Sequence, residues 1–234
     1  MNPVMRCFLL LTMVLTLATP AFCDKADGYF AHGNSKAGRG DYKGAIKDFT
    51  KAIELQSNFA GAYVHRALAK LMLGDTSGAF DDLAKAVQVK PDFVEAYAVR
   101  GLAKATHHDP KGAMADFTKA AQLDPTFALT YCGRGKLFLD EGNIDGAIED
   151  YDLASKLSPG VATQFGSDFA PAYYKRGTSK LSKGDTDGAI ADFTKAVQLR
   201  PNYADAYEGR GTAERTKGNT AGANSDFATA AALR

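Results

Sequence analysis

The chain has 234 residues, enough for one large or two small domains, and 28 basic against 27 acidic residues give it a net charge of +1. The charges are interspersed and form no basic run, so the composition argues against nucleic acid as a partner. Three cysteines are too few for a disulfide-rich domain, and stability must therefore come from packing.

The N-terminal segment, residues 1–23, has the layout of a secretory signal peptide. A short, weakly positive start is followed by apolar residues from Cys7 to Ala18 and by small, helix-breaking residues that end at Cys23. The apolar run of about twelve residues is well short of the ~20 needed to cross a bilayer. We therefore predict export to a periplasmic or extracellular location, with no stable membrane span after cleavage. An uncleaved anchor is the main alternative.

Beyond the predicted signal peptide, the segment 24–234 consists of repeats with a period of 34 residues. Each unit has Tyr at its fourth position, a small residue at its eighth, Ala at its twentieth and twenty-seventh, and a large apolar residue at its twenty-fourth. The fourth unit carries about eight extra residues, 160–167, and Pro159 is expected to close it. The six units are 26–59, 60–93, 94–127, 128–169, 170–203 and 204–234.

This pattern resembles the tetratricopeptide repeat over essentially the whole of residues 26–234. The resemblance implies an all-α fold, a right-handed superhelical solenoid of six helix-turn-helix repeats. Elementary packing agrees, because small residues allow two helices to approach and one hairpin cannot bury its apolar face without neighbours. Polar residues before each first helix are predicted N-caps: Asn58, Asp92, Thr126, Asp168 and Asn202.

Three columns depart from the family pattern. The seventh position is Arg in five units and the twenty-third is always Asp, so we predict an ion pair across each hairpin, such as Arg176 with Asp192. The nineteenth position is always Gly, which costs stability in a helix and suggests that a neighbouring backbone passes close to it.

The sequence offers no convincing catalytic, cofactor or metal site. His107 and His108 are adjacent, point in different directions and lack the spacing of zinc ligands, and Asp109 beside them adds only a weak case. Cys132 has no His or Asn placed by a known motif to activate it, and a small apolar residue on a helix face is the favoured interpretation. We predict no enzyme activity, no cofactor and no bound metal.

Binding therefore remains as the predicted function. The resemblance implies that positions 2, 5, 9, 12 and 13 of each unit line a concave groove for a partner's peptide or helix. A clamp for acidic peptide tails would need a lysine at position 5, which this chain lacks. Burial of part of the set between repeats is the alternative. The predicted groove residues are Phe30, Asn34, Val64, Leu68, Leu71, Met72, Leu102, Lys136, Leu139 and Tyr174.

We thus expect a non-catalytic interaction scaffold or adaptor that binds a protein or peptide partner. The alternative is a self-associating structural component of an envelope assembly, which would be a homo-oligomer, and measurement of size in solution would separate the two. An enzyme is a further rival, although no motif indicates which residue would carry the activity.

Overall fold

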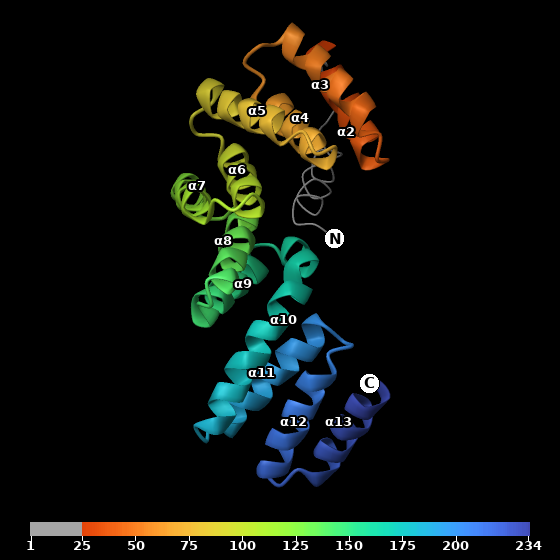
Figure 1. The fold of residues 1–234 in the computed structure, drawn as a ribbon, viewed down its shortest axis with the longest axis vertical. Coiled ribbons are helices and arrows are strands. Elements are labelled where there is room, and N and C mark those ends of the chain that lie inside the picture. The colour runs from red at the N-terminus through yellow and green to blue at the C-terminus, as the bar shows by residue number, and fades with distance from the viewer. Residues whose placement is uncertain (1–24) are drawn as a thin grey trace. The chain divides into compact units, whose positions relative to one another are not determined.

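The computed structural model describes residues 25–234, which form two compact units, one ending at Gly133 and one beginning at Arg134. Within that range the chain folds into twelve helices and no strands (Figure 1). The predicted signal peptide, residues 1–23, lies outside the described residues. The predicted all-α fold is confirmed, and each repeat is a pair of helices joined by a short turn.

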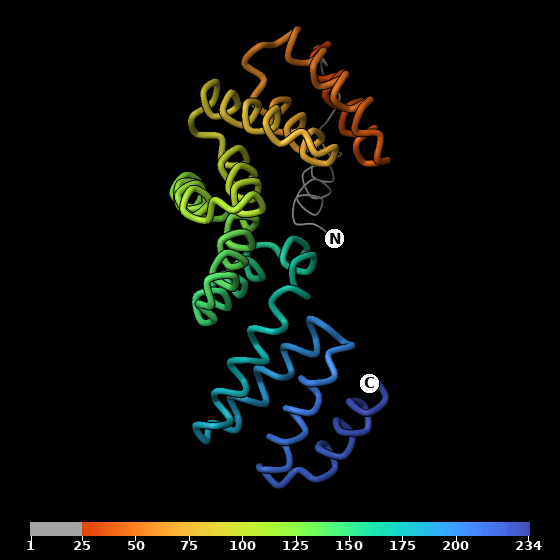
Figure 2. The backbone as a smooth tube through the Cα atoms, viewed as in Figure 1, coloured from red at the N-terminus to blue at the C-terminus, as the bar shows by residue number. Residues whose placement is uncertain are grey.

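The N-terminal unit contains three complete antiparallel helix pairs, and the tube in Figure 2 shows that consecutive pairs lie side by side. Its first and second helices alternate along the chain, as the 34-residue period requires. The helices are α2 (Lys25–Gly38), α3 (Tyr42–Leu55), α4 (Ala60–Met72), α5 (Thr76–Val89), α6 (Val94–Thr106) and α7 (Pro110–Leu123).

The division between the two units falls within α8 (Ala128–Asp140), the first helix of the fourth repeat. The C-terminal unit then continues with the same alternation of first and second helices. Its further helices are α9 (Ile144–Leu157), α10 (Pro159–Ser182), α11 (Thr186–Leu199), α12 (Ala204–Thr216) and α13 (Thr220–Ala232).

Every second helix begins in the same way, which explains the constant glycine at position 19. In α3 the side chain of Asp41 caps the helix by accepting a hydrogen bond from the backbone N–H of Gly44 at 2.9 Å. A Cβ atom on Gly44 would lie only 2.1 Å from the Asp41 carboxylate. The expectation that a neighbouring backbone approaches this glycine is therefore wrong, because the close atom belongs to the cap of the same helix.

The first helices begin differently from the prediction. The cap of α4 is Phe59 and that of α6 is Phe93, and neither cap makes a side-chain hydrogen bond. The predicted caps Asn58 and Asp92 therefore lie one residue too early, and the same holds for Asn202, since Tyr203 caps α12. Aromatic residues thus occupy the positions from which these helices start.

Two further predicted caps also fall outside the cap position. Asp168 lies inside α10, and Thr126 precedes α8 in a turn where its backbone N–H donates to the side chain of Asp124.

The small residues at position 8 allow aromatic rings to sit against the first helices. A Cβ on Gly33 would lie 2.5 Å from the Phe49 ring, and one on Gly101 would lie 2.8 Å from the Phe117 ring. Both rings are completely buried. The predicted complementarity between small and large columns is therefore confirmed, and it fixes how closely the two helices of a repeat approach.

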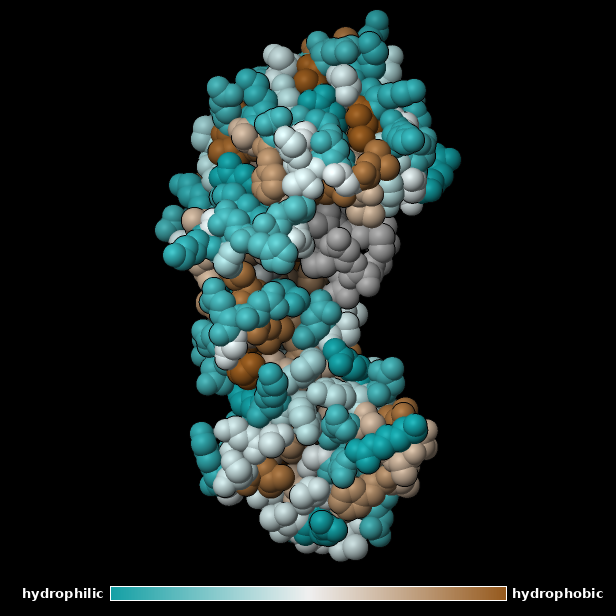
Figure 3. All heavy atoms as spheres, in the orientation of Figure 1, coloured by the Kyte–Doolittle hydropathy of each residue, from teal (hydrophilic) through white to brown (hydrophobic). Residues whose placement is uncertain are grey.

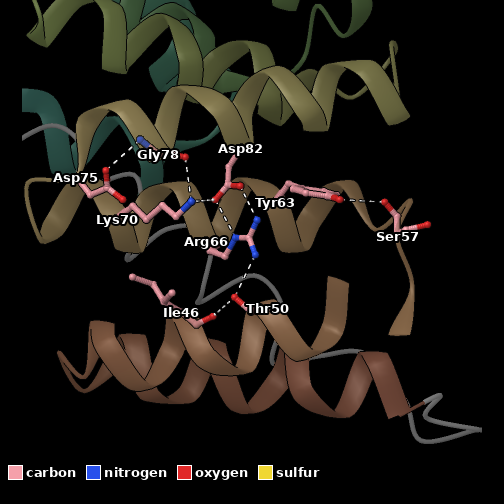
Figure 4. Close-up of polar contacts among 9 residues, drawn as sticks. All are labelled: Ile46, Thr50, Ser57, Tyr63, Arg66, Lys70, Asp75, Gly78 and Asp82. Carbon is pink, nitrogen blue, oxygen red and sulfur yellow. Dashed lines mark hydrogen bonds and ion pairs between the residues drawn. The ribbon is translucent and has the colours of Figure 1, made fainter. Parts of the chain in front are cut away.

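The predicted ion pairs across the hairpins form in all five repeats that carry the arginine. In the second repeat, Nε and Nη2 of Arg66 donate to the two carboxylate oxygens of Asp82 at 2.8 and 2.6 Å (Figure 4). Two parallel hydrogen bonds fix both distance and orientation, so each pair sets the register of its hairpin. We call these pairs the Arg–Asp braces: Arg66–Asp82, Arg100–Asp116, Arg134–Asp150, Arg176–Asp192 and Arg210–Asp226.

Three features of these ion pairs were not predicted. Lysine at position 11 joins three of them, and Lys70 Nζ lies 2.8 Å from Asp82 (Figure 4). In the first repeat, where His32 replaces the arginine, Lys36 alone pairs with Asp48 at 2.7 Å. Arg66 also donates to the hydroxyl of Thr50 at 3.0 Å, which connects the second repeat to the first.

The extra residues of the fourth unit lengthen a helix rather than forming a loop. Pro159 was expected to close the unit, but it lies in the first turn of α10. A backbone N–H at that position has no partner within the helix, so proline loses no hydrogen bond there. Phe165 and Phe169 in this helix are buried, and the Phe169 ring stacks on Tyr151 of α9 with centroids 4.6 Å apart. The segment 160–167 is therefore part of the core of the C-terminal unit.

No helix among residues 25–234 is long and apolar enough to cross a membrane. Hydrophilic residues cover most of the face shown in Figure 3, and hydrophobic residues appear between them in small patches. Surface patches of that kind are ordinary in folded proteins, so the hydropathy of this face does not by itself indicate a binding site.

Candidate functional site

A pocket of about 440 Å³ lies in the N-terminal unit, near the start of α4 and α6. Helix α2 and the turns that precede α4 and α6 contribute to its walls. The volume falls within the range of roughly 300–1,000 Å³ that is typical of ligand sites. We call it the phenylalanine pocket, and its lining residues are Phe30, Gln56, Asn58, Phe59, Ala60, Gly61, His65, Lys90, Phe93 and Glu95.

Three phenylalanines line this pocket. Phe30 comes from α2, and its ring lies 4.8 Å from the ring of Phe59, measured between centroids, at a tilt of 46°. Gly61 stands beside them, and a Cβ placed there would be in ordinary contact with both rings, at 3.5 Å from Phe59 and 3.6 Å from Phe30. Because Gly61 has no side chain, no atom of its own covers the rings of Phe30 and Phe59, and both line the pocket.

The other end of the pocket carries charge. The Lys90 ammonium lies 5.0 Å from the centroid of the Phe93 ring, in the geometry of a cation–π contact. Glu95 is half-buried in the first turn of α6, and burial raises the pKa of its carboxyl group, while the charge of Lys90 partly opposes that effect. A partly dehydrated carboxylate thus lies beside aromatic rings.

His65 forms the inner wall. Only 1% of its surface is exposed, and its Nδ1 lies 2.6 Å from the side-chain oxygen of Asn34. Its ring meets Phe30 edge-on, with 4.9 Å between centroids. Burial lowers the pKa of His65 from 6.5 to about 4, because the protonated ring would lose its hydration. At neutral pH the imidazole is therefore uncharged.

Sequence models of a single family match three parts of the chain. A tetratricopeptide-repeat model matches residues 30–92, another matches residues 128–160, and a TPR-repeat model matches residues 177–214. Together with the six helix pairs, these matches decide the family. The chain is a tetratricopeptide-repeat (TPR) protein. No match was found among curated proteins.

Solved structures of other TPR proteins share the fold. YrrB, described as a TPR protein with an unusual peptide-binding site, is 22% identical, with a TM-score of 0.53 over 77% of this chain and 89% of its own. TTC0263, a thermophilic TPR protein from Thermus thermophilus, is 21% identical, with a TM-score of 0.59 over 80% and 98%. PilW, described as a widely conserved type IV pilus biogenesis factor, is 20% identical, with a TM-score of 0.61 over 88% and 92%. At these identities the likeness establishes an all-α TPR solenoid.

The binding role of the ten residues predicted to line a TPR groove stays a prediction, but the structure shows where they lie. Half of them are buried and expose at most 8% of their surface. Leu102, for example, lies 3.2 Å from a Cβ built on Gly133, between α6 and α8. Among the ten predicted groove residues, a partner could therefore contact mainly those that are partly exposed. The buried five are Phe30, Asn34, Val64, Leu68 and Leu102, and the partly exposed five are Leu71, Met72, Lys136, Leu139 and Tyr174.

The structure brings only some of these residues together. Phe30 and Asn34 meet around His65 in the N-terminal unit. Tyr174 belongs to the C-terminal unit, where its ring lies 5.8 Å from Phe193 and 5.3 Å from Tyr203. Of the predicted residues, only Phe30 lines the phenylalanine pocket.

Sequence reasoning missed most of the pocket, although two signals pointed to it. Position 2 was named as a groove position, and it is occupied here by Gly61 and Glu95. Five of the six units end in an aromatic residue, and Phe59 and Phe93 are two of these. The periodicity of the sequence does not show that position 2 and the last position of neighbouring units meet at one pocket.

The histidine pair is part of a turn. His108 adopts a left-handed backbone conformation with φ of 62°, where the other five turns of this type have glycine. His107 lies 2.9 Å from the hydroxyl of Thr76 through its Nε2, and the Asp109 side chain caps α7. Within residues 25–234, no group of three or more His, Cys, Asp or Glu side chains is placed to hold a metal ion.

Proposed function

We propose that this TPR protein is a non-catalytic scaffold that binds a peptide segment of a partner protein, and that the phenylalanine pocket is a point of contact. The observation that carries the proposal is that the partly exposed rings of Phe59 and Phe93 line one hollow together with the largely buried ring of Phe30. Aromatic side chains dominate the energetics of protein interfaces because each buries a large area at a small entropic cost. A pocket with a few polar groups among them also supplies orientation.

The family supports the same class of function. TPR arrays are interaction modules, and one protein of the same fold is described as having a peptide-binding site. This chain adds support of its own, because its lining residues come together around one pocket.

Selection from a random dodecapeptide library displayed on phage would test the proposal. We expect enriched peptides to bind the purified chain and to lose at least tenfold in affinity, or about 1.4 kcal/mol, when Phe59 is changed to Ala. A second variant, Gly61→Met, should block the pocket without removing any of its walls. Leu73→Ala, which changes an exposed side chain at the far end of α4, is the matched control and should bind normally.

Two results would refute the proposal. One is the absence of any enriched peptide, and the other is enrichment of peptides that bind Phe59→Ala and Gly61→Met as tightly as the unchanged chain. Circular dichroism of each variant would show that its helices remain, so a loss of binding could be assigned to the pocket.

The proposal also includes export. It is supported by the apolar segment from Cys7 to Ala18 and the small residues that follow it. Mass spectrometry of the chain recovered from its native cells should give a mature protein that begins close to Asp24. Recovery of the intact chain from the cytoplasm would contradict this part of the proposal.

A further inference from the structure

Glu95 has no ion-pair partner in the part of the chain that the structure describes. The carboxylate is half-buried in the phenylalanine pocket, and it makes no hydrogen bond or ion pair with another side chain among residues 25–234. The first turn of α6 favours a negative charge at this position, because the helix dipole is positive there. The carboxylate thus feels the charge of Lys90 through space, but no side chain among the described residues donates a hydrogen bond to it.

The aromatic rings in the same pocket suit a cation. The face of an aromatic ring carries a partial negative charge and attracts an ammonium or guanidinium group. The chain itself shows this at the rim, where the ammonium of Lys90 lies 5.0 Å from the centroid of Phe93. Phe30 and Phe59 form a second aromatic surface, with their ring centroids 4.8 Å apart.

Other occupants would fit the pocket less well. A purely apolar side chain would complete the burial of Glu95 and leave its carboxylate without a partner, which is costly in a dry site. An acidic side chain would add a like charge beside it. A basic side chain would satisfy the carboxylate and stack on the rings at the same time, and the flat guanidinium of arginine does both best.

We propose that the phenylalanine pocket takes an arginine side chain of the bound peptide, with Glu95 as its counter-charge and Phe30, Phe59 and Phe93 as its aromatic walls. This inference rests on the proposed peptide-binding function, and it defines which peptides the chain selects.

The test uses the peptides obtained by phage selection, synthesised with each arginine in turn replaced by citrulline, which has the same shape without the charge. Isothermal titration calorimetry at pH 7.5 should show a loss of at least tenfold in affinity at one arginine. In Glu95→Gln the original peptide should bind at least tenfold more weakly, and the difference between arginine and citrulline should disappear. Asp81→Asn makes the same change of charge at an exposed site outside the pocket and should leave both affinities unchanged.

The possible failures can be told apart. If selected peptides need Phe59 but bind equally well with citrulline, or bind Glu95→Gln as tightly as the unchanged chain, the inference is overturned and the peptide-binding function stands. Selection of acidic peptides would overturn it as well and would assign recognition to Lys90. If no peptide is enriched, the proposed function fails and the inference fails with it.

Discussion

The stability of the N-terminal unit should fall with acidification because of His65. This histidine is 1% exposed, it lies between the rings of Phe30 and Phe49, and its Nδ1 is 2.6 Å from the Asn34 side-chain oxygen. Burial lowers its pKa to about 4 from the ordinary 6.5. The unfolded chain therefore takes up a proton below pH 6.5, whereas the folded chain does so only near pH 4.

The size of the effect follows from the two pKa values. One pKa unit corresponds to about 1.4 kcal/mol, so the shift of His65 from 6.5 to about 4 is equivalent to about 3 kcal/mol. Acidification lowers the free energy of unfolding, because the unfolded state binds a proton that the folded state does not. The contribution is complete above pH 6.5, declines between pH 6.5 and 4, and does not decline further below pH 4.

Urea unfolding followed by circular dichroism at 222 nm would measure this loss at pH 7 and at pH 4.5. In His65→Asn, an amide can still donate to Asn34 but cannot take up a proton. We expect the variant to lose about 2–3 kcal/mol less than the unchanged chain between the two pH values. His32→Asn, at an exposed histidine of the same unit, is the control and should lose as much as the unchanged chain.

The comparison between variants removes the effect of the carboxylates, which titrate in the same range and are common to all three proteins. If the unchanged chain and His65→Asn lost the same free energy of unfolding on acidification, the reasoning from the burial of His65 would be refuted.

Three further predictions concern stability, and urea unfolding measures each. Asp82→Ala should cost about 3 kcal/mol, because Arg66 and Lys70 would remain partly buried without their shared carboxylate. His108→Gly should stabilise the chain by about 1 kcal/mol, since glycine adopts the left-handed conformation of this turn without steric cost. Phe165→Ala should cost about 3–5 kcal/mol, because its ring is buried in the core of the C-terminal unit.

Each of these has a matched control and a contrary outcome. Glu54→Ala breaks an exposed pair with Lys51 and should cost less than about 0.5 kcal/mol, so an equal cost for Asp82→Ala would show that burial does not matter. Gly74→His should destabilise the equivalent turn, and no change there would contradict the argument for His108. Thr163→Ala on exposed α10 surface should have little effect, and a similar result for Phe165→Ala would mean that the segment 160–167 is not core.

The register of the hairpins could be predicted from the sequence because the residues that set it recur at fixed positions of each repeat. Arginine at position 7 and aspartate at position 23 recur together, and the geometry of Arg66 and Asp82 confirms their pairing. The contribution of Lys70 was not predicted, although the sequence has a lysine at position 11, one turn further along the same helix. A carboxylate has room for more than one donor, and the second donor completes the pairing.

The phenylalanine pocket could not be predicted in the same way. The predicted caps are Asn58 and Asp92, whereas the residues that follow them, Phe59 and Phe93, occupy the cap positions. The conformation of the turn before the helix decides on which side of the helix start the phenylalanine ring lies. The hollow also depends on Gly61, and the lack of a side chain is not a periodic signal. An alignment of the repeats shows the residues that all of them share. The pocket depends on residues, such as Gly61, that differ between neighbouring repeats.

The Arg–Asp braces have a consequence for how such a chain can change length. In each braced hairpin the arginine and its aspartate are sixteen residues apart in the chain and belong to the same repeat. Removal or duplication of a whole 34-residue unit therefore takes away or adds both charges together and leaves no buried ion without its counter-ion. A cut in the middle of a unit would separate them. Each repeat thus contains its buried aspartate together with the basic side chains that pair with it, and that makes it the smallest segment by which the gene could gain or lose length without leaving a buried charge unpaired.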